Sequence, residues 1–258
     1  MRATSHDGRR PAVELHFHLL PAVDDGPATM ADSLELARLA VEQGTGTVVA
    51  TPHVRPDFVD DVWELPGRVA ELRAALATEG VPLTVLCGGE MGHTMVGRLG
   101  QPELELLAQG PAGARWLLVE APFEAIGEDF HAATAELRDR GFGVLIAHPE
   151  RSADAAVDGA SGLRRELAAG SLAQVNALSL TGEHGFEARR AGLLLAEQGL
   201  ATAVASDAHG PTRPPALLAA ECKLAASPAG PEVAKRLAYS GPRLLLAHGM
   251  AGRIPVTA

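Results

Sequence analysis

The sequence predicts an α/β fold in which parallel strands form a barrel, incomplete or distorted, rather than an open Rossmann sheet. Seven short apolar segments have the length and composition of buried strands, and stretches with helical spacing separate most of them. A glycine precedes five of the strands at a position where it could end a helix. The recurrent order of helix, glycine and apolar strand is typical of βαβ units. The first strand is not followed by a GxGxxG turn, which disfavours a dinucleotide site.

The expected strands are AVELHF (12–17), GTVVA (46–50), LTVLCG (83–88), WLLVE (116–120), GVLIA (143–147), AQVNA (173–177) and ATAVAS (201–206). The glycines expected to end helices are Gly44, Gly80, Gly141, Gly170 and Gly199. The first helix is expected within residues 29–44, with Thr29 or Asp32 as its cap. The segment from about Pro214 onward is expected to be helical.

Composition limits the domain organisation and the partners. No linker divides the chain, so we expect a flexible leader over residues 1–11 and a single domain over residues 12–258. A net charge of −10 argues against nucleic acid or an anionic membrane as the main partner. The leader does not resemble a secretory signal, and no apolar run reaches the roughly 18 residues that span a bilayer. We therefore expect a cytoplasmic protein without membrane insertion.

Polar residues follow the expected strands where each strand ends. In parallel barrels, chemistry takes place at the carboxyl ends of the strands. In chain order these ends carry His16, His18 and Asp25; His53; Glu90; Glu120; His148 and Arg151; Asn176; and Asp207 and His209. Five of the ten histidines follow apolar runs directly, whereas surface histidines usually fall on loops and helices. This alignment indicates one functional site.

The residue types at these strand ends indicate a metal centre. His16 and His18 are two apart on a strand, so their side chains point the same way. Five histidines and four carboxylates exceed the needs of one tetrahedral ion, and two or three ions sharing bridging carboxylates would use them. Mixed imidazole and carboxylate ligands suit Mn, Fe or Zn. Such ions bind phosphoryl oxygens and generate a hydroxide nucleophile near neutral pH.

Two arginines lie near the same strand ends. Arg151 follows the fifth-strand histidine within AHPER, and Arg213 stands four residues after His209. A guanidinium group matches a phosphate bidentately, so the pair is expected to bind an oxyanion beside the metals.

The segments HFHLLPAVDDG, TPH, GGE, LLVEAP, AHPER, QVNALSLTGEHG and ASDAH, in this order, resemble a known family. It is that of the bacterial manganese-dependent protein tyrosine phosphatases of capsular and exopolysaccharide loci, within the PHP (polymerase and histidinol phosphatase) superfamily. The resemblance covers residues 13–215. It implies a distorted seven-stranded (β/α) barrel of the PHP type and three divalent metal ions, manganese first, with Fe or Zn as alternatives.

Several residue roles are implied by this resemblance. The implied metal ligands are His16, His18, Asp25, His53, Glu90, Glu120, His148, Asp207 and His209. Glu120 would join His16, His18 and Asp207 at the first metal as a bridge. Arg151 and Arg213 would bind the substrate phosphate, and Asp207 or His209 could also move a proton. The implied reaction is attack of metal-bound hydroxide on the phosphorus of phosphotyrosine, with a polysaccharide-assembly tyrosine kinase as the protein partner.

Departures from the family pattern leave the substrate preference open, whereas all the implied metal ligands are present. Glu14 stands where the family has aspartate, and Ser152 stands where tyrosine is common. Histidinol phosphatase, or another small phosphate ester hydrolase, therefore remains an alternative, as does a non-catalytic PHP-like domain that binds metal or phosphate. An amidohydrolase is disfavoured, because Glu120 occupies the place where that class carries a carbamylated lysine. Oligomeric state stays open.

The other histidines are expected to be less central. His6, His131 and His248 are expected to be solvated, whereas His93 and His184 lie near strand ends and could touch substrate.

Overall fold

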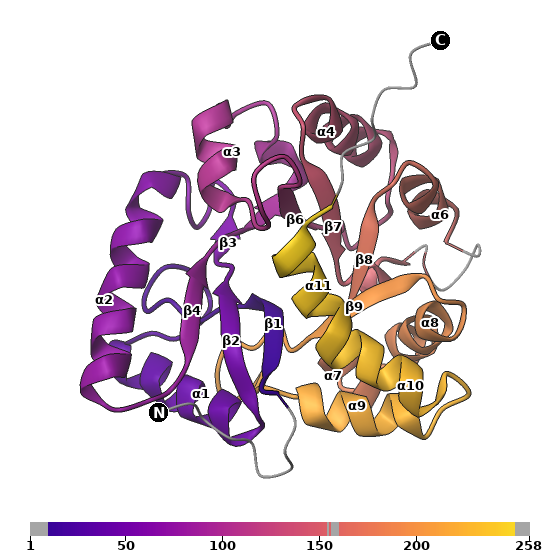
Figure 1. The fold of residues 1–258 in the computed structure, drawn as a ribbon. Helices are drawn as coiled ribbons and strands as arrows, with labels where there is room; N and C mark the ends of the chain where they lie inside the picture. The colour runs from indigo at the N-terminus through magenta and orange to yellow at the C-terminus, as the bar shows by residue number, and fades with distance from the viewer. Residues whose placement is uncertain (1–9, 154, 156–159, 251–258) are drawn as a thin grey trace.

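The computed structural model describes residues 10–153, 155 and 160–250, which form an α/β fold with nine strands in two parallel sheets (Figure 1). The strands are β1 (Ala12–Phe17), β2 (Thr45–Ala50), β3 (His53–Val54), β4 (Thr84–Cys87), β5 (Glu90–Gly92), β6 (Trp116–Glu120), β7 (Gly143–Ala147), β8 (Leu172–Asn176) and β9 (Ala201–Ala205). The three-stranded sheet has the order β1-β2-β4, and the six-stranded sheet has the order β3-β5-β6-β7-β8-β9. The expected α/β fold with parallel strands is thus confirmed.

Two interruptions explain why nine strands appear where seven were expected. Thr51 and Pro52 separate β2 from β3, and proline has no N–H for a strand ladder. Gly88 and Gly89 separate β4 from β5 in the neighbouring strand. A Cβ at Gly88 would lie 2.6 Å from a methyl carbon of Val49, so glycine permits the close approach of the chains there. Beyond the interruptions the backbone joins the second sheet.

The first and last strands meet, although the described residues do not form one continuous closed sheet. The N–H of Asp207 donates to the carbonyl of His16 at 3.1 Å, and the N–H of His18 donates to the carbonyl of Ala208 at 2.9 Å. An isolated parallel bridge joins Phe17 to Ala208. The end of β1 therefore lies beside the segment that follows β9.

Helices surround the strands (Figure 1). They are α1 (Met30–Glu42), α2 (Leu65–Thr78), α3 (Gln101–Leu107), α4 (Glu128–Asp139), α6 (Ser161–Ala168), α7 (Ala177–Thr181), α8 (Phe186–Glu197), α9 (Leu217–Ala225), α10 (Gly230–Lys235) and α11 (Gly241–His248). Short turns of other helical types are η1 (Val62–Glu64), η2 (His93–Met95), η3 (Pro149–Arg151) and η4 (Arg236–Ser240). The expectation of helices beyond Pro214 is confirmed. Every helix among the described residues is too short or too polar to span a bilayer.

The expected helix boundaries are confirmed at the first helix and at the glycines. Thr29 and Asp32 form a reciprocal capping box at the start of α1, so both candidates take part in the cap. All five glycines expected to end helices have positive φ angles, which a glycine adopts without the steric cost of a Cβ.

The core consists of two clusters of buried apolar side chains. The larger one includes side chains from the strands and from the helices packed on them. The smaller one gathers residues of β1, β2, β6, β7 and β9 with Leu245 of α11. The indole N–H of Trp116 in β6 donates to the carbonyl of Leu245 at 3.1 Å, which fixes α11 across the strands (Figure 1). Of the expected leader, only Arg10 and Pro11 lie within the described residues.

One expectation about the remaining histidines is wrong. His131 of α4 is buried, and its Nδ1 lies 2.6 Å from Glu166 Oε1 of α6. The spacing of apolar residues in α4 does not reveal that α6 packs against the side of α4 that carries His131. His248 is exposed as expected, and His6 lies outside the described residues.

Candidate metal centre

The structure brings the nine residues predicted as metal ligands to one place at the carboxyl ends of the strands. His16, His53, Glu90 and Glu120 lie on β1, β3, β5 and β6, while His18, Asp25, His148, Asp207 and His209 follow strand ends. Their ligand atoms form four groups, and within each group the atoms lie within 4.8 Å of one another. The groups are His18, Asp25, His53 and His209; His16, His18 and Asp207; His16, Glu90 and His148; and His53, Glu90 and Glu120.

Glu90 is the central carboxylate of this cluster. It is fully buried, and its Oε2 lies 3.3 Å from His16 Nε2 and 2.8 Å from His53 Nδ1. Its Oε1 lies 2.8 Å from His148 Nε2. Glu120, by contrast, groups only with His53 and Glu90. The structure therefore differs from the division implied by the resemblance, because Glu90 rather than Glu120 lies beside His16.

Outward hydrogen bonds orient three of the imidazoles. His16 Nδ1 lies 2.9 Å from Gln174 Oε1, and His18 Nδ1 lies 2.6 Å from Asp24 Oδ2. His209 Nδ1 lies 2.8 Å from the carbonyl of Asp207. Each acceptor favours the tautomer with the proton on Nδ1, which leaves an Nε2 lone pair facing the cluster. A partner on the outer nitrogen is the usual arrangement of metal-binding histidines.

The inner atoms of the cluster fit a set of cations. Five buried polar atoms of the predicted ligands have no partner in hydrogen-bond geometry among the described residues, although two of them, Glu90 Oε2 and His53 Nδ1, lie only 2.8 Å apart. They are His53 Nδ1, Glu90 Oε2, His148 Nδ1, Asp207 Oδ1 and His209 Nε2. Unpaired buried polar atoms are costly, and their concentration in one place needs an explanation. The Nε2 atoms of His16 and His18 also lie only 3.2 Å apart. A donor set of imidazoles and carboxylates without thiolates fits first-row divalent metals.

The charges in the cluster depend strongly on one another. Burial alone would raise the pKa of Glu90, but the nearby charges and hydrogen bonds of His16 and His148 hold this pKa well below its usual range. Asp207 follows the same pattern, and its pKa is also lowered. Burial would lower the pKa of His18, but hydrogen bonds to Asp207 and Asp24 raise it well above its usual range. The carboxylates are thus held in the anionic form that binds metals.

Backbone strain occurs at two of the predicted ligands. His148 has a φ of 36° and Asp207 has a φ of 50°, both in the left-handed region. Such conformations cost energy for residues other than glycine and are concentrated at functional sites. At both positions the chain turns sharply after a buried strand, so that the side chain faces the cluster.

Both predicted arginines lie beside the cluster. Arg151 Nη1 lies 3.5 Å from Asp207 Oδ2, and Arg213 Nη2 donates to Asp25 Oδ2 at 2.5 Å. Neither side chain is fully buried. The two guanidinium groups therefore approach the carboxylates from the solvent side, where an anionic ligand would enter.

Several supporting residues were not predicted from the sequence. Gln174 is fully buried in β8 and orients His16, as described above. Asp24 accepts from the N–H of Gly26, as a turn residue does, and its Oδ2 also lies against Nδ1 of His18. Asn176, which the sequence did place at a strand end, donates from its Nδ2 to Asp207 Oδ2 at 2.8 Å. The strand-end pattern cannot find Gln174, since it lies in the middle of β8 and a mid-strand glutamine carries no distinctive signal.

Glu14 and Glu150 are buried carboxylates outside the ligand groups. Glu14 accepts from the hydroxyl of Thr45 at 3.0 Å and from the N–H of Ser206 at 2.6 Å, which joins β1 to its neighbours. Glu150 accepts from the N–H of Asn176 at 2.9 Å and so fixes the turn that carries Arg151. Burial raises the pKa of both carboxyl groups.

His184 lies near this turn as well. Its Nδ1 is 3.0 Å from the hydroxyl of Ser179, and burial, together with the charge of Arg151, lowers its pKa to about 4. His93 is half-buried, with its ring 5.8 Å from that of Phe130.

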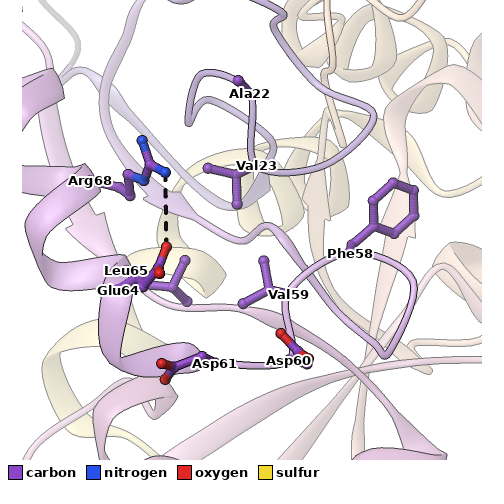
Figure 2. Close-up of a pocket in the computed structure, with 9 residues that line it drawn as sticks. All are labelled: Ala22, Val23, Phe58, Val59, Asp60, Asp61, Glu64, Leu65 and Arg68. Atoms are coloured by element: carbon purple, nitrogen blue, oxygen red, sulfur yellow. Dashed lines mark ion pairs between the residues drawn. The ribbon is translucent and has the colours of Figure 1, made fainter.

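A cavity of about 190 Å³ lies beside Phe58, which contacts the predicted ligand His53. Figure 2 shows its lining, which includes Val23, Val59 and Leu65 together with the carboxylates of Asp60, Asp61 and Glu64. Phe58, another lining residue, stacks on the His53 ring with 5.4 Å between the ring centroids. The loop that bears Asp25 and the segment that follows β3 thus also form walls of this cavity.

Comparison with known proteins agrees with these observations. Residues 12–247 match the family model described as capsular polysaccharide synthesis, CpsB/CapC. Tyrosine-protein phosphatase YwqE of Bacillus subtilis is 32% identical over 198 residues, covering 76% of this chain and 77% of YwqE. The putative tyrosine-protein phosphatase CapC of Staphylococcus aureus is 31% identical, covering 80% of each chain. Tyrosine-protein phosphatase CpsB of Streptococcus pneumoniae is 26% identical, covering 91% of this chain and 98% of CpsB.

One solved structure is similar to this chain in both sequence and fold, and a second is similar in fold alone. A structure from a study of YwqE and CpsB, described there as unique metal-dependent tyrosine phosphatases, superposes with a TM-score of 0.82 at 30% identity. It covers 92% of this chain and 96% of that chain. The phosphotriesterase homology protein of Escherichia coli, with a TM-score of 0.61 at 13% identity over 90% of this chain and 97% of its own, shares the fold alone. By its match over nearly the whole described length, the chain belongs to the CpsB/CapC family of capsular polysaccharide synthesis.

Proposed function

We propose that this chain is a metal-dependent phosphomonoester hydrolase whose main substrate is phosphotyrosine on a protein. The observation that carries the proposal is the cluster of inward-facing imidazole and carboxylate atoms, with two arginines at its solvent side. The family relatives named tyrosine-protein phosphatases support the choice of substrate. A tyrosine kinase of capsular or exopolysaccharide assembly is the proposed protein partner, and the proposed location is the cytoplasm.

We further propose that the nine clustered residues hold three divalent ions, with manganese as the physiological metal. Glu90 is the proposed bridging carboxylate, since it belongs to two of the four ligand groups. The two sheets would then form one distorted seven-stranded (β/α) barrel of the PHP type, with the interrupted strands counted once each.

The side chains of this chain have separable roles in hydrolysis. Bound divalent ions would polarise the phosphoryl oxygens and lower the pKa of water. Arg151 and Arg213 bind the equatorial oxygens and stabilise the charge that develops there. Water adds to phosphorus in line, the bond from phosphorus to the phenol oxygen breaks, and a phenolate leaves with little need of a general acid. Asp207 and His209 are the candidates for moving the proton of the water.

The test is phosphate release from a phosphotyrosine peptide and, in parallel, from histidinol phosphate, first with manganese and then with a chelator. We expect chelator-sensitive release from the peptide. A preference for histidinol phosphate would instead indicate that the protein is a histidinol phosphatase. Absence of release from both, with metal bound, would leave a binding role and contradict the proposal.

His16→Ala is the variant that separates catalysis from folding. It should abolish release while circular dichroism shows a folded protein. Arg164→Ala, a change at an exposed residue of α6 that belongs to none of the ligand groups, is the control and should leave turnover unchanged.

A further inference from the structure

Phe123 is an exposed aromatic ring beside the phosphate-binding side of the cluster. The chain contains few aromatic residues, 3% in all, and most of its phenylalanines are at least partly buried. Phe123 nevertheless exposes 47% of its surface. Its ring lies parallel to that of His148, with an angle of 5° and 6.2 Å between the centroids. An exposed ring in contact with a predicted metal ligand is a candidate for contact with substrate.

The guanidinium group of Arg151 lies over the same ring. Its Cζ is 4.8 Å from the centroid of Phe123, and its Nη1 is directed toward Asp207 in the cluster. Cation–π attraction keeps an arginine in this position. A phosphate bound by Arg151 would therefore have Phe123 as its aromatic neighbour.

The backbone fixes this ring relative to Arg151. The N–H of Ala153, two residues after Arg151, donates to the carbonyl of Phe123 at 2.8 Å. The hydroxyl of Ser152 donates to the carbonyl of Pro122. The loop after β6 and the turn after β7 are thus joined at the residues next to the ring and the guanidinium group.

From this arrangement we infer that Phe123 is a specificity-determining residue that contacts the aromatic ring of the substrate. The inference rests on the proposed function. In an aryl phosphate the ring is attached directly to the phosphate ester oxygen, so binding the phosphate at Arg151 brings the ring next to Phe123. Aromatic rings attract each other in offset-stacked and edge-to-face arrangements. An alkyl phosphate offers no such ring, so Phe123 favours phosphotyrosine over phosphoserine and other alkyl esters.

Phe58 provides a matched comparison beside another predicted ligand of the cluster. It also stacks on a predicted ligand, His53, and has an arginine, Arg55, 5.2 Å from its centroid. However, Arg55 is paired with Asp57 and Glu120, and Phe58 is half-buried and lines the cavity of Figure 2. Arg55 thus lies beside Glu120, whereas the two arginines assigned to phosphate lie beside Asp207 and Asp25.

The experiment compares kcat/KM for a phosphotyrosine peptide and for the same peptide with phosphoserine, using the manganese-loaded full chain. Phe123→Leu should lower the ratio of the two values about three- to tenfold, because leucine keeps apolar surface but loses the ring. Phe123→Tyr should restore the ratio. Phe58→Leu should change both substrates by the same factor.

A binding measurement gives a readout independent of turnover. Calorimetry with benzylphosphonate and with inorganic phosphate should show weaker phosphonate binding in Phe123→Leu and unchanged phosphate binding. An unchanged substrate ratio in Phe123→Leu, or a ratio that falls in Phe58→Leu instead, would overturn the inference. Wild-type protein that releases no phosphate from the phosphotyrosine peptide would contradict the proposed function itself, which distinguishes the two failures.

Discussion

The buried carboxylate of Glu166 allows a quantitative prediction about stability. Glu166 is 1% exposed and accepts from Thr134 at 2.9 Å, from Arg138 at 3.0 Å and from Ser171 at 2.8 Å, in addition to its contact with His131. These bonds join α4, α6 and the start of β8. Removing one partner of a buried ion pair typically costs 3–5 kcal/mol. Glutamine keeps the shape and part of the hydrogen bonding, so Glu166→Gln should cost about 3 kcal/mol.

For a domain of this length, about 3 kcal/mol corresponds to a fall in Tm of roughly 6–12 °C. Differential scanning calorimetry at neutral pH measures this change. The matched control is Glu128→Gln, which removes an exposed ion pair with Arg165 between the same two helices and should leave Tm within experimental error.

The contribution of Glu166 to stability is also expected to depend on pH. Burial alone would raise the pKa of Glu166, but hydrogen bonds from His131, Arg138, Ser171 and Thr134 outweigh burial and lower it below the usual 4.5. A lowered pKa stabilises the folded state above the unfolded-state pKa, and this stability is lost as pH falls through the folded value. The Tm difference between wild type and Glu166→Gln should therefore shrink below about pH 4.5. Equal Tm values at neutral pH, or a difference that grows on acidification, would refute the reasoning.

Three further predictions concern the metal centre. Gln174→Leu removes the acceptor for His16 Nδ1 and should weaken metal affinity about 10–100-fold in a competitive chelator titration, whereas exposed Gln101→Leu should not. Manganese at about 100 times its Kd should stabilise the protein by about 2.7 kcal/mol. Thermal unfolding should show this as a rise in Tm that a chelator reverses. An equal rise in Tm for His18→Ala would argue against metal binding at this site. Arg213→Lys replaces the bidentate guanidinium group by a point charge and should lower kcat/KM for phosphotyrosine about tenfold or more. An unchanged kcat/KM would show that Arg213 does not bind the phosphate.

The positions of the candidate ligands were predictable, because each follows or ends an apolar strand and parallel strands bring such positions together. The sequence did not predict which of these ligands are neighbours in space, because neighbours are decided by the register between strands. Glu90 pairs with His53 on one side and with Leu118 on the other, so Glu120 lies level with Gly92, two residues further along. That offset places Glu90 beside His16 and Glu120 toward Arg55. No pattern within a single strand encodes it.

The sequence also could not predict how the interrupted strands continue. Pro52 and the pair Gly88–Gly89 are visible in the sequence, but each could equally mark the end of a strand. The formation of a second ladder beyond them follows from pairing between β3 and β5, which only the folded chain provides. His131 was missed for the same reason, since its partner Glu166 lies on another helix.

The meeting of β1 with the segment after β9 affects when the site can form during synthesis. His16 and His18 are synthesised well before Asp207 and His209. Domains emerge and fold from the N-terminus, and contacts between distant parts of a chain form slowly. A nascent chain that lacks Asp207 has neither the hydrogen bond that aligns β1 nor the carboxylate between His16 and His18. The proposed metal centre can therefore form only after the segment that follows β9 has been synthesised.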